Sequence, residues 1–166
     1  MSQERWAELC GLFREMQGTF RDDHRRAWIL ARTLRIDLHN YLGCDIDNIT
    51  LYDYDEEKHT YKLENSPIDA VSMNADYKWF FGVGITLEPA PNTFPKTCFQ
   101  FPVWLHINAE PNEIDTSFGR VAIPAGSPTD LSGACELIYH GFIRSLKNRT
   151  AKTLRDQKFG FLDFKE

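Results

Sequence analysis

Residues 77–107 read YKWFFGVGITLEPAPNTFPKTCFQFPVWLHI, and this stretch decides the fold. Apolar side chains occupy every second position from Tyr77 to Leu87 and again from Phe99 to Ile107. A period of two predicts two long strands, each with one face against a core. The proline-marked segment between them predicts a loop. Pro102 has no amide hydrogen, so we expect its strand to lie at a sheet edge or to contain a bulge there.

Shorter strands are expected on both sides of this pair. Residues 49–54 alternate in the same way, and residues 60–63 return after an acidic turn, which together predict a hairpin. A further strand is predicted over residues 118–123, and the phenylalanines of residues 159–164 suggest a closing strand or an apolar tail.

Three segments carry apolar residues at every third or fourth position, which predicts three helices. The first is expected over residues 2–17, with an interruption at Gly18-Thr19. The second is expected over residues 22–42, which begin with acids and end before a glycine. Thr129 or Asp130 is suited to cap the third helix.

This order of elements predicts an α+β fold. We expect a mostly antiparallel sheet of about five or six strands, with two N-terminal helices and one C-terminal helix packed on it. The chain has 166 residues, which is close to the common size of one domain. We therefore expect residues 1–166 to form a single domain.

The composition is that of an ordinary globular protein, with 42% hydrophobic and 26% charged residues. The net charge of −5 argues against a protein that wraps nucleic acid with its whole surface. The chain shows no signal peptide and no apolar run long enough to cross a bilayer. Its four cysteines lack the close spacing of a zinc or redox pair. We expect a cytoplasmic protein with free thiols.

A basic stripe on the second predicted helix is the first candidate site. The residues on this side are Arg21, Arg25, Trp28, Arg32, Arg35 and His39. Arginines around an indole can engage an acidic protein partner, or contact phosphates while stacking on a base. The alternative is a solvated helix face with a purely structural role.

The two long strands suggest a second candidate. If they pair across the proline loop, Gly82 and Gly84 lie near Trp104, and Phe80 lies near His106. Glycines opposite large rings leave a shallow concavity that can accept a small ligand or a peptide strand. The alternative is that rings cover the glycines.

The segments Pro67-Ile68-Asp69 and Asp76-Tyr77-Lys78 suggest a third candidate. They resemble the acid and acid-x-lysine elements of the PD-(D/E)xK nuclease superfamily, in which carboxylates hold magnesium and a lysine steadies the attacking water. The resemblance implies a magnesium-dependent nuclease using Asp69, Asp76 and Lys78. The interval between the two segments is shorter than in that pattern, and Lys78 opens an aromatic strand.

The sequence contains no signature of a catalytic nucleophile or of a dinucleotide cofactor. We therefore predict no cofactor, no metal site and no catalytic residue, and favour a protein that is not an enzyme. The leading hypothesis is a small interaction or regulatory module that binds another macromolecule, most readily a protein, through Arg25, Trp28, Arg32, Arg35 and His39. The alternative is a ligand-binding sensor using Gly82, Gly84, Trp104 and His106. Homo-oligomerisation is compatible with either hypothesis.

Overall fold

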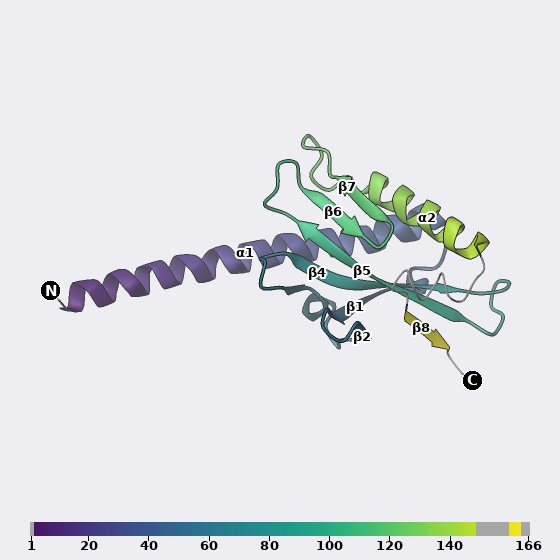
Figure 1. Ribbon diagram of the computed structural model, residues 1–166, viewed down its shortest axis with the longest axis horizontal. Helices are drawn as coiled ribbons and strands as arrows, with labels where there is room; N and C mark the ends of the chain where they lie inside the picture. The colour runs from purple at the N-terminus through teal and green to yellow at the C-terminus, as the bar shows by residue number, and fades with distance from the viewer. Residues whose placement is uncertain (1, 149–159, 164–166) are drawn as a thin grey trace.

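The computed structural model describes residues 2–148 and 160–163. One long helix projects from a twisted sheet, and a second helix lies beside the sheet (Figure 1). In chain order the elements are α1 (Ser2–Leu42), the 3-10 turn η1 (Ile46–Asn48), β1 (Ile49–Asp55), β2 (Thr60–Lys62), the 3-10 turn η2 (Pro67–Ala70), β3 (Ser72–Met73), β4 (Trp79–Leu87), β5 (Thr97–His106), β6 (Glu113–Thr116), β7 (Gly119–Ala122), α2 (Ser132–Lys147) and β8 (Gly160–Asp163).

The strands form one sheet in the order β2-β1-β4-β5-β6-β7, with β3 added to β4 and β8 added to β5. Each pairing within the described residues is antiparallel. The α+β class and the mostly antiparallel sheet are therefore confirmed. The sheet has more strands than predicted, because β3 and β6 are too short to show a clear alternation.

Strands β4 and β5 form the centre of the sheet, paired from Trp79 opposite Leu105 to Leu87 opposite Thr97. The second side of β5 is divided, since β6 pairs with its residues 103–106 and β8 with its residues 97–100. Pro102 falls in the gap between these two ladders. A proline is tolerated there because no amide hydrogen is needed on that side.

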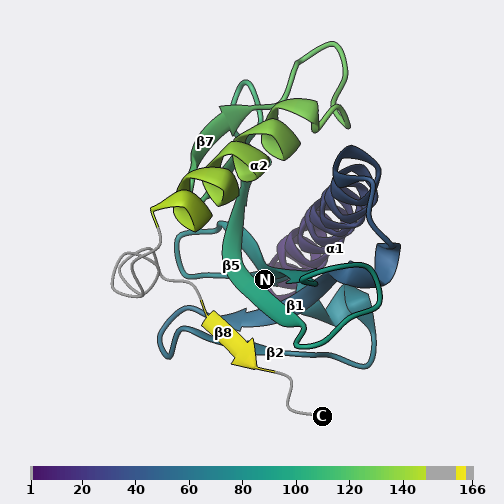
Figure 2. The ribbon, with the colours of Figure 1, turned by 90° about the vertical axis from the view of Figure 1, so that its right-hand side faces the viewer.

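The core lies between one face of the sheet and the two helices. Phe81 and Val103 on the sheet pack in one buried cluster with Leu34 of α1 and Ile138 of α2. Figure 2 looks nearly along α1 and shows α2 crossing beside β7. The apolar face of each helix therefore covers the apolar face of the sheet, as the sequence periods predict.

The prediction of two N-terminal helices is wrong, because α1 is one continuous helix of 41 residues. Gly18 does not interrupt it. A glycine inside a helix costs about 1 kcal/mol relative to alanine, and no proline follows that would end the helix. The Thr19 hydroxyl donates to the Glu15 carbonyl oxygen at 3.2 Å, so Thr19 is accommodated inside the helix as well.

No helix in the described ranges is both long enough and apolar enough to span a membrane. The four cysteines, Cys10, Cys44, Cys98 and Cys135, are free, and the last two are buried. Burial, and secondarily the charge of Asp37, raise the pKa of Cys135 to about 12. This thiol is therefore held in its neutral form inside the core.

Candidate functional site

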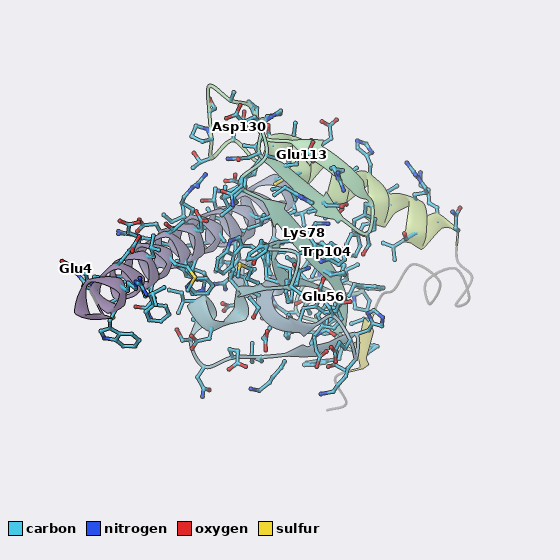
Figure 3. The ribbon with its side chains drawn as sticks, turned by 60° about the vertical axis from the view of Figure 1, so that its left-hand side comes forward. Glu4, Glu56, Lys78, Trp104, Glu113 and Asp130 are labelled. Carbon is cyan, nitrogen blue, oxygen red and sulfur yellow. The ribbon has the colours of Figure 1, made fainter. Side chains whose placement is uncertain are left out.

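The amino-terminal half of α1 extends beyond the sheet as a bare arm, which we define as residues 2–20 (Figures 1 and 3). Glu4 lies near its free end, far from Lys78 before β4 and from Trp104 in β5 (Figure 3). Large apolar side chains on this arm are 46% to 69% exposed; they are Trp6, Leu9, Leu12, Phe13, Met16 and Phe20. So many large exposed apolar side chains on one element indicate an interaction surface.

Five of these side chains form one straight stripe along the arm, which we call the arm stripe: Trp6, Leu9, Phe13, Met16 and Phe20. Their intervals alternate between three and four residues, the spacing with which helices pack against other helices. Ala27, Leu34 and Leu38 continue the same stripe and are fully buried against the sheet. The arm stripe therefore has the pattern of a core-facing surface, although its residues stay largely exposed and, among the rings described, only Phe20 contacts the sheet, at Trp79.

A pocket of about 970 Å³ opens at the base of the arm, and we call it the basal pocket. It is lined by Phe13, Met16, Gln17, Thr19, Phe20, Arg21, Asp23, Met73, Tyr77, Trp79 and Asn108. One wall is thus the arm itself, and the other wall comes from the β3–β4 turn and the end of the sheet. Its volume lies in the range of sites that hold a ligand or a large side chain.

The β3–β4 turn fixes the second wall of the basal pocket. The Asn74 side-chain oxygen accepts hydrogen bonds from the amides of Asp76 at 3.1 Å and Lys78 at 3.0 Å. Tyr77 has a φ of 59° in this turn, and its side chain is 76% exposed. The turn therefore holds an exposed aromatic ring at the mouth of the pocket.

Stacked rings form the boundary between arm and sheet. Phe20 and His24 of α1 both lie 5.2 Å, centroid to centroid, from the buried ring of Trp79. His24 Nε2 also lies 3.2 Å from the Val71 carbonyl oxygen. A smaller pocket of about 390 Å³ borders the same rings on the side of Asp69. These contacts anchor α1 where the arm begins.

The basic stripe predicted on the second helix is partly structural. Arg35 Nε donates to the Ile49 carbonyl oxygen at 2.7 Å, and its Nη2 donates to the Ile46 carbonyl oxygen at 3.3 Å. His39 Nδ1 lies 2.5 Å from the Cys44 carbonyl oxygen. These two side chains satisfy backbone groups of the connection between α1 and β1.

The other members of the basic stripe differ in exposure. Arg25 and Arg32 are exposed, while Trp28 is half-buried and packs against the core cluster. The stripe therefore presents three exposed guanidinium groups, those of Arg21, Arg25 and Arg32, and a half-buried indole.

The concavity predicted at Gly82 and Gly84 is filled. Gly82 pairs with Pro102, Gly84 with Gln100 and Phe80 with Trp104, so Trp104 and His106 lie two residues along β5 from the places predicted for them. A Cβ atom at Gly82 would lie 2.6 Å from the ring of Tyr61, and one at Gly84 would lie 2.6 Å from the ring of Tyr52. The glycines thus make room for two tyrosines on the face of the sheet away from the helices.

Trp104 on that same face has a partner of its own, whereas His106 Nε2 is buried without a hydrogen-bond partner among the described residues. Trp104 Nε1 donates to the Glu56 carboxylate at 2.6 Å, and both residues are labelled in Figure 3. His106 Nε2 lies 4.0 Å from the Asp115 carboxylate, which is bound by Arg120 at 2.9 Å.

Burial, and secondarily Cys98, raise the pKa of Tyr52 to about 12.

The predicted nuclease residues lie on separate features. Asp69 belongs to the 3-10 turn η2 and lines the smaller pocket, whereas Asp76 and Lys78 belong to the β3–β4 turn region. Across the described residues, no group of three or more His, Cys, Asp or Glu side chains is placed to hold a metal ion. The magnesium-dependent nuclease stays a prediction without a structural observation in its favour.

Comparison with protein-family models, curated proteins and solved structures finds no match to this chain. The candidate site is therefore identified from its geometry alone. The sequence predicts that the arm stripe is one face of a helix. It does not predict whether that face is buried or exposed, because the spacing of the apolar residues is the same in both cases. The pocket walls at Met73 and Asn108 come from a two-residue strand and a turn, which give no periodic signal.

Proposed function

We propose that this chain is a protein-interaction module whose working surface is the arm stripe together with the basal pocket. The surface binds an amphipathic α-helix of a protein partner. The observation that carries the proposal is the exposed run of large apolar side chains at heptad spacing on a helix that projects from the sheet. A macromolecular partner was the leading sequence hypothesis, and the proposal moves the contact from the basic stripe to the apolar one.

Helix packing explains why the expected partner is helical. A helix presents ridges at intervals of three and four residues, which fit between the side chains of another helix with the same spacing. Burying one large apolar side chain contributes about 1.5–3 kcal/mol. The sum over the five side chains of the arm stripe, about 7–15 kcal/mol, is of the same order as the cost of immobilising two chains, so the affinity depends on how closely the two surfaces fit.

The exposed arginine Arg21, which lines the basal pocket, serves in this proposal as a polar rim beside the apolar contact. Charged groups at a rim influence the rate of encounter more than the final affinity. The four free cysteines fit a reducing compartment, and we propose that the module works in the cytoplasm.

Photo-crosslinking at single positions tests the proposal. A benzoylphenylalanine placed at Phe13 of the full chain, in extract of its source cells, should form an adduct with a protein. Mass spectrometry should map the crosslink to an amphipathic helical segment. The matched control carries the same group at Arg32 and should give little adduct. Adducts from position 32 alone would move the function back to the basic stripe, and no adduct at either position would sink the proposal.

The basal pocket supports a second candidate function, the binding of a small apolar molecule. Its volume of about 970 Å³ and its aromatic walls favour this function. Anilinonaphthalene sulfonate serves as the probe. Trp6 is not among the residues that line the pocket, so Trp6→Glu should leave the probe fluorescence unchanged if the pocket binds small molecules, and Met73→Glu should abolish it. Loss of fluorescence in Trp6→Glu would assign the probe to the arm stripe.

A further inference from the structure

The arm is long enough and apolar enough to form a stable pair with another helix of equal length. Six large apolar side chains on it are 46% to 69% exposed. A standard protein–protein interface buries about 800 Å² on each partner. Six such side chains supply an area on that order, because a large aromatic side chain alone can bury about 150–250 Å². The arm therefore needs a partner that matches it along its whole length.

The sides of the arm stripe are nearly free of charge. Its immediate flanks carry the uncharged residues Cys10, Leu12 and Gln17 and, within residues 4–20, a single charge, that of Arg5. Most charges of the arm point more than about 100° away from the stripe at 100° per residue, namely those of Glu4, Glu8, Arg14 and Glu15. A second surface of the same kind can thus approach the stripe without burying like charges.

We infer that the partner helix is the arm of a second copy of this chain, and that the two arms pair antiparallel over residues 2–20. The inference rests on the proposed function and names its partner. Aligning Ser2 of one copy with Phe20 of the other overlaps the two bare segments completely. This alignment brings Leu9 to the level of Phe13 of the other copy, and Trp6 to the level of Met16.

The basal pocket is the observation that selects this alignment. Its wall along α1 runs from Phe13 to Asp23, with Met16 near the middle, and Tyr77 and Trp79 stand on the other side. Trp6 of the second copy arrives at the level of Met16, so its indole occupies the pocket. By twofold symmetry each copy fills the pocket of the other. A parallel pair places Trp6 beside Trp6, away from both pockets.

Charge favours the same alignment. Arg5 and Asp23 lie on the same flank of α1, each about 60° from the centre of the stripe. Antiparallel helices bring like flanks together, and a helical side chain points toward its own amino end. Arg5 of one copy therefore extends toward Asp23 of the other. That carboxylate already accepts a hydrogen bond from Arg26 at 3.3 Å and keeps 20% of its side-chain surface exposed.

Mass measurement of the full chain is the first test. Light scattering during size-exclusion chromatography should give twice the 19.3 kDa mass of one chain. The variant Trp6→Glu with Phe13→Glu should give half of that dimer mass, with an unchanged circular dichroism spectrum in the strand region. Arg14→Glu adds the same charge to the outer side of the arm and should remain a dimer.

Disulfide trapping tests the direction of the arms. In a Cys10→Ser background, Leu9→Cys and Phe13→Cys are made in separate chains of different length and mixed under mild oxidation. The antiparallel pair predicts a disulfide between position 9 of one chain and position 13 of the other. A parallel pair would favour links between identical positions.

Each outcome bears on the inference. A monomer at all concentrations, links between identical positions, or a dimer that survives the double glutamate variant would overturn it. The proposed function fails separately, since it requires an adduct from position 13 to a helical segment of some protein. A monomeric chain that still crosslinks to the helix of another protein would end the second-copy inference and keep the function.

Discussion

Arg35 has a structural role that its neighbour Arg32 lacks. Its guanidinium donates to two carbonyl oxygens at the start of β1, whereas Arg32 is exposed. Hydrogen bonds to a charged group contribute about 1.5–3 kcal/mol. We expect Arg35→Gln to lower the free energy of unfolding by about that range, measured by urea denaturation. Arg32→Gln is the matched control and should change it little; equal losses in both variants would contradict the assignment.

Position 82 requires a glycine because two tyrosine side chains lie close to it. A Cβ atom there would lie 2.6 Å from the Tyr61 ring and 3.1 Å from Cβ of Tyr52. We expect Gly82→Ala to destabilise the fold by about 1–3 kcal/mol through overpacking. Gly11 has no neighbouring atom within 4 Å of such a Cβ, so Gly11→Ala should stabilise α1 by about 0.5–1 kcal/mol. Thermal unfolding followed by circular dichroism should show a lower midpoint temperature for Gly82→Ala and a higher one for Gly11→Ala.

The raised pKa of Tyr52 makes the free energy of unfolding depend on pH in the alkaline range. Its pKa is raised from 10.0 to about 12, mainly by burial and then by Cys98. The folded chain keeps a proton that the unfolded chain releases, so this contribution is complete below pH 10.0 and is lost as pH rises through about 12. Tyr52→Phe should flatten the fall of the urea midpoint over this window. A fall of undiminished size in that variant would refute the role of Tyr52.

At the scale of elements, α1 divides into two halves that differ in support. Residues 27–38 contribute fully buried side chains to the core, while the arm contacts the rest of the chain only at its base. Isolated helices shorter than about 12–15 residues are marginal in water. In the Trp6→Glu, Phe13→Glu variant we expect amide hydrogens of residues 4–18 to exchange much faster than those of residues 27–38. Uniform protection along α1, measured by mass spectrometry, would show that the arm has support of its own.

The elements themselves could largely be predicted from the sequence. The alternation at Trp79–Leu87 and Thr97–His106 predicted β4 and β5, because both strands alternate over many residues. The break at Gly18 was wrong, since the cost of one glycine is smaller than the gain of continuing a helix through a matching stripe. Exposure of the arm could not be predicted, because a bare face and a buried face have the same period.

The contacts of individual side chains could not be predicted from the sequence, for a related reason. The carbonyl groups that bind Arg35 belong to the chain that follows α1, and the rings that cover Gly82 come from β1 and β2. Both depend on where distant segments meet. Arg35 and the glycine pair therefore resembled parts of binding sites, although these residues serve the fold.

At the scale of the whole molecule, the arm adds surface without adding to the core. None of its large side chains before Phe20 belongs to the buried cluster. We expect a chain that lacks residues 1–18 to fold, with its free energy of unfolding within about 1 kcal/mol of the Trp6→Glu, Phe13→Glu variant. Urea denaturation at a single protein concentration compares the two monomers. A loss of cooperative unfolding would mean that the arm is part of the fold.

The divided second side of β5 has a mechanical consequence. Strand β8 is held by a four-residue ladder that ends before Pro102, and β6 is held by a different ladder beyond it. A force applied at the carboxyl end therefore separates β8 from β5 in one short step and unpairs no further strand. The separation does not extend to β6, because β6 pairs with other residues of β5 and the element before β8 in the chain is α2.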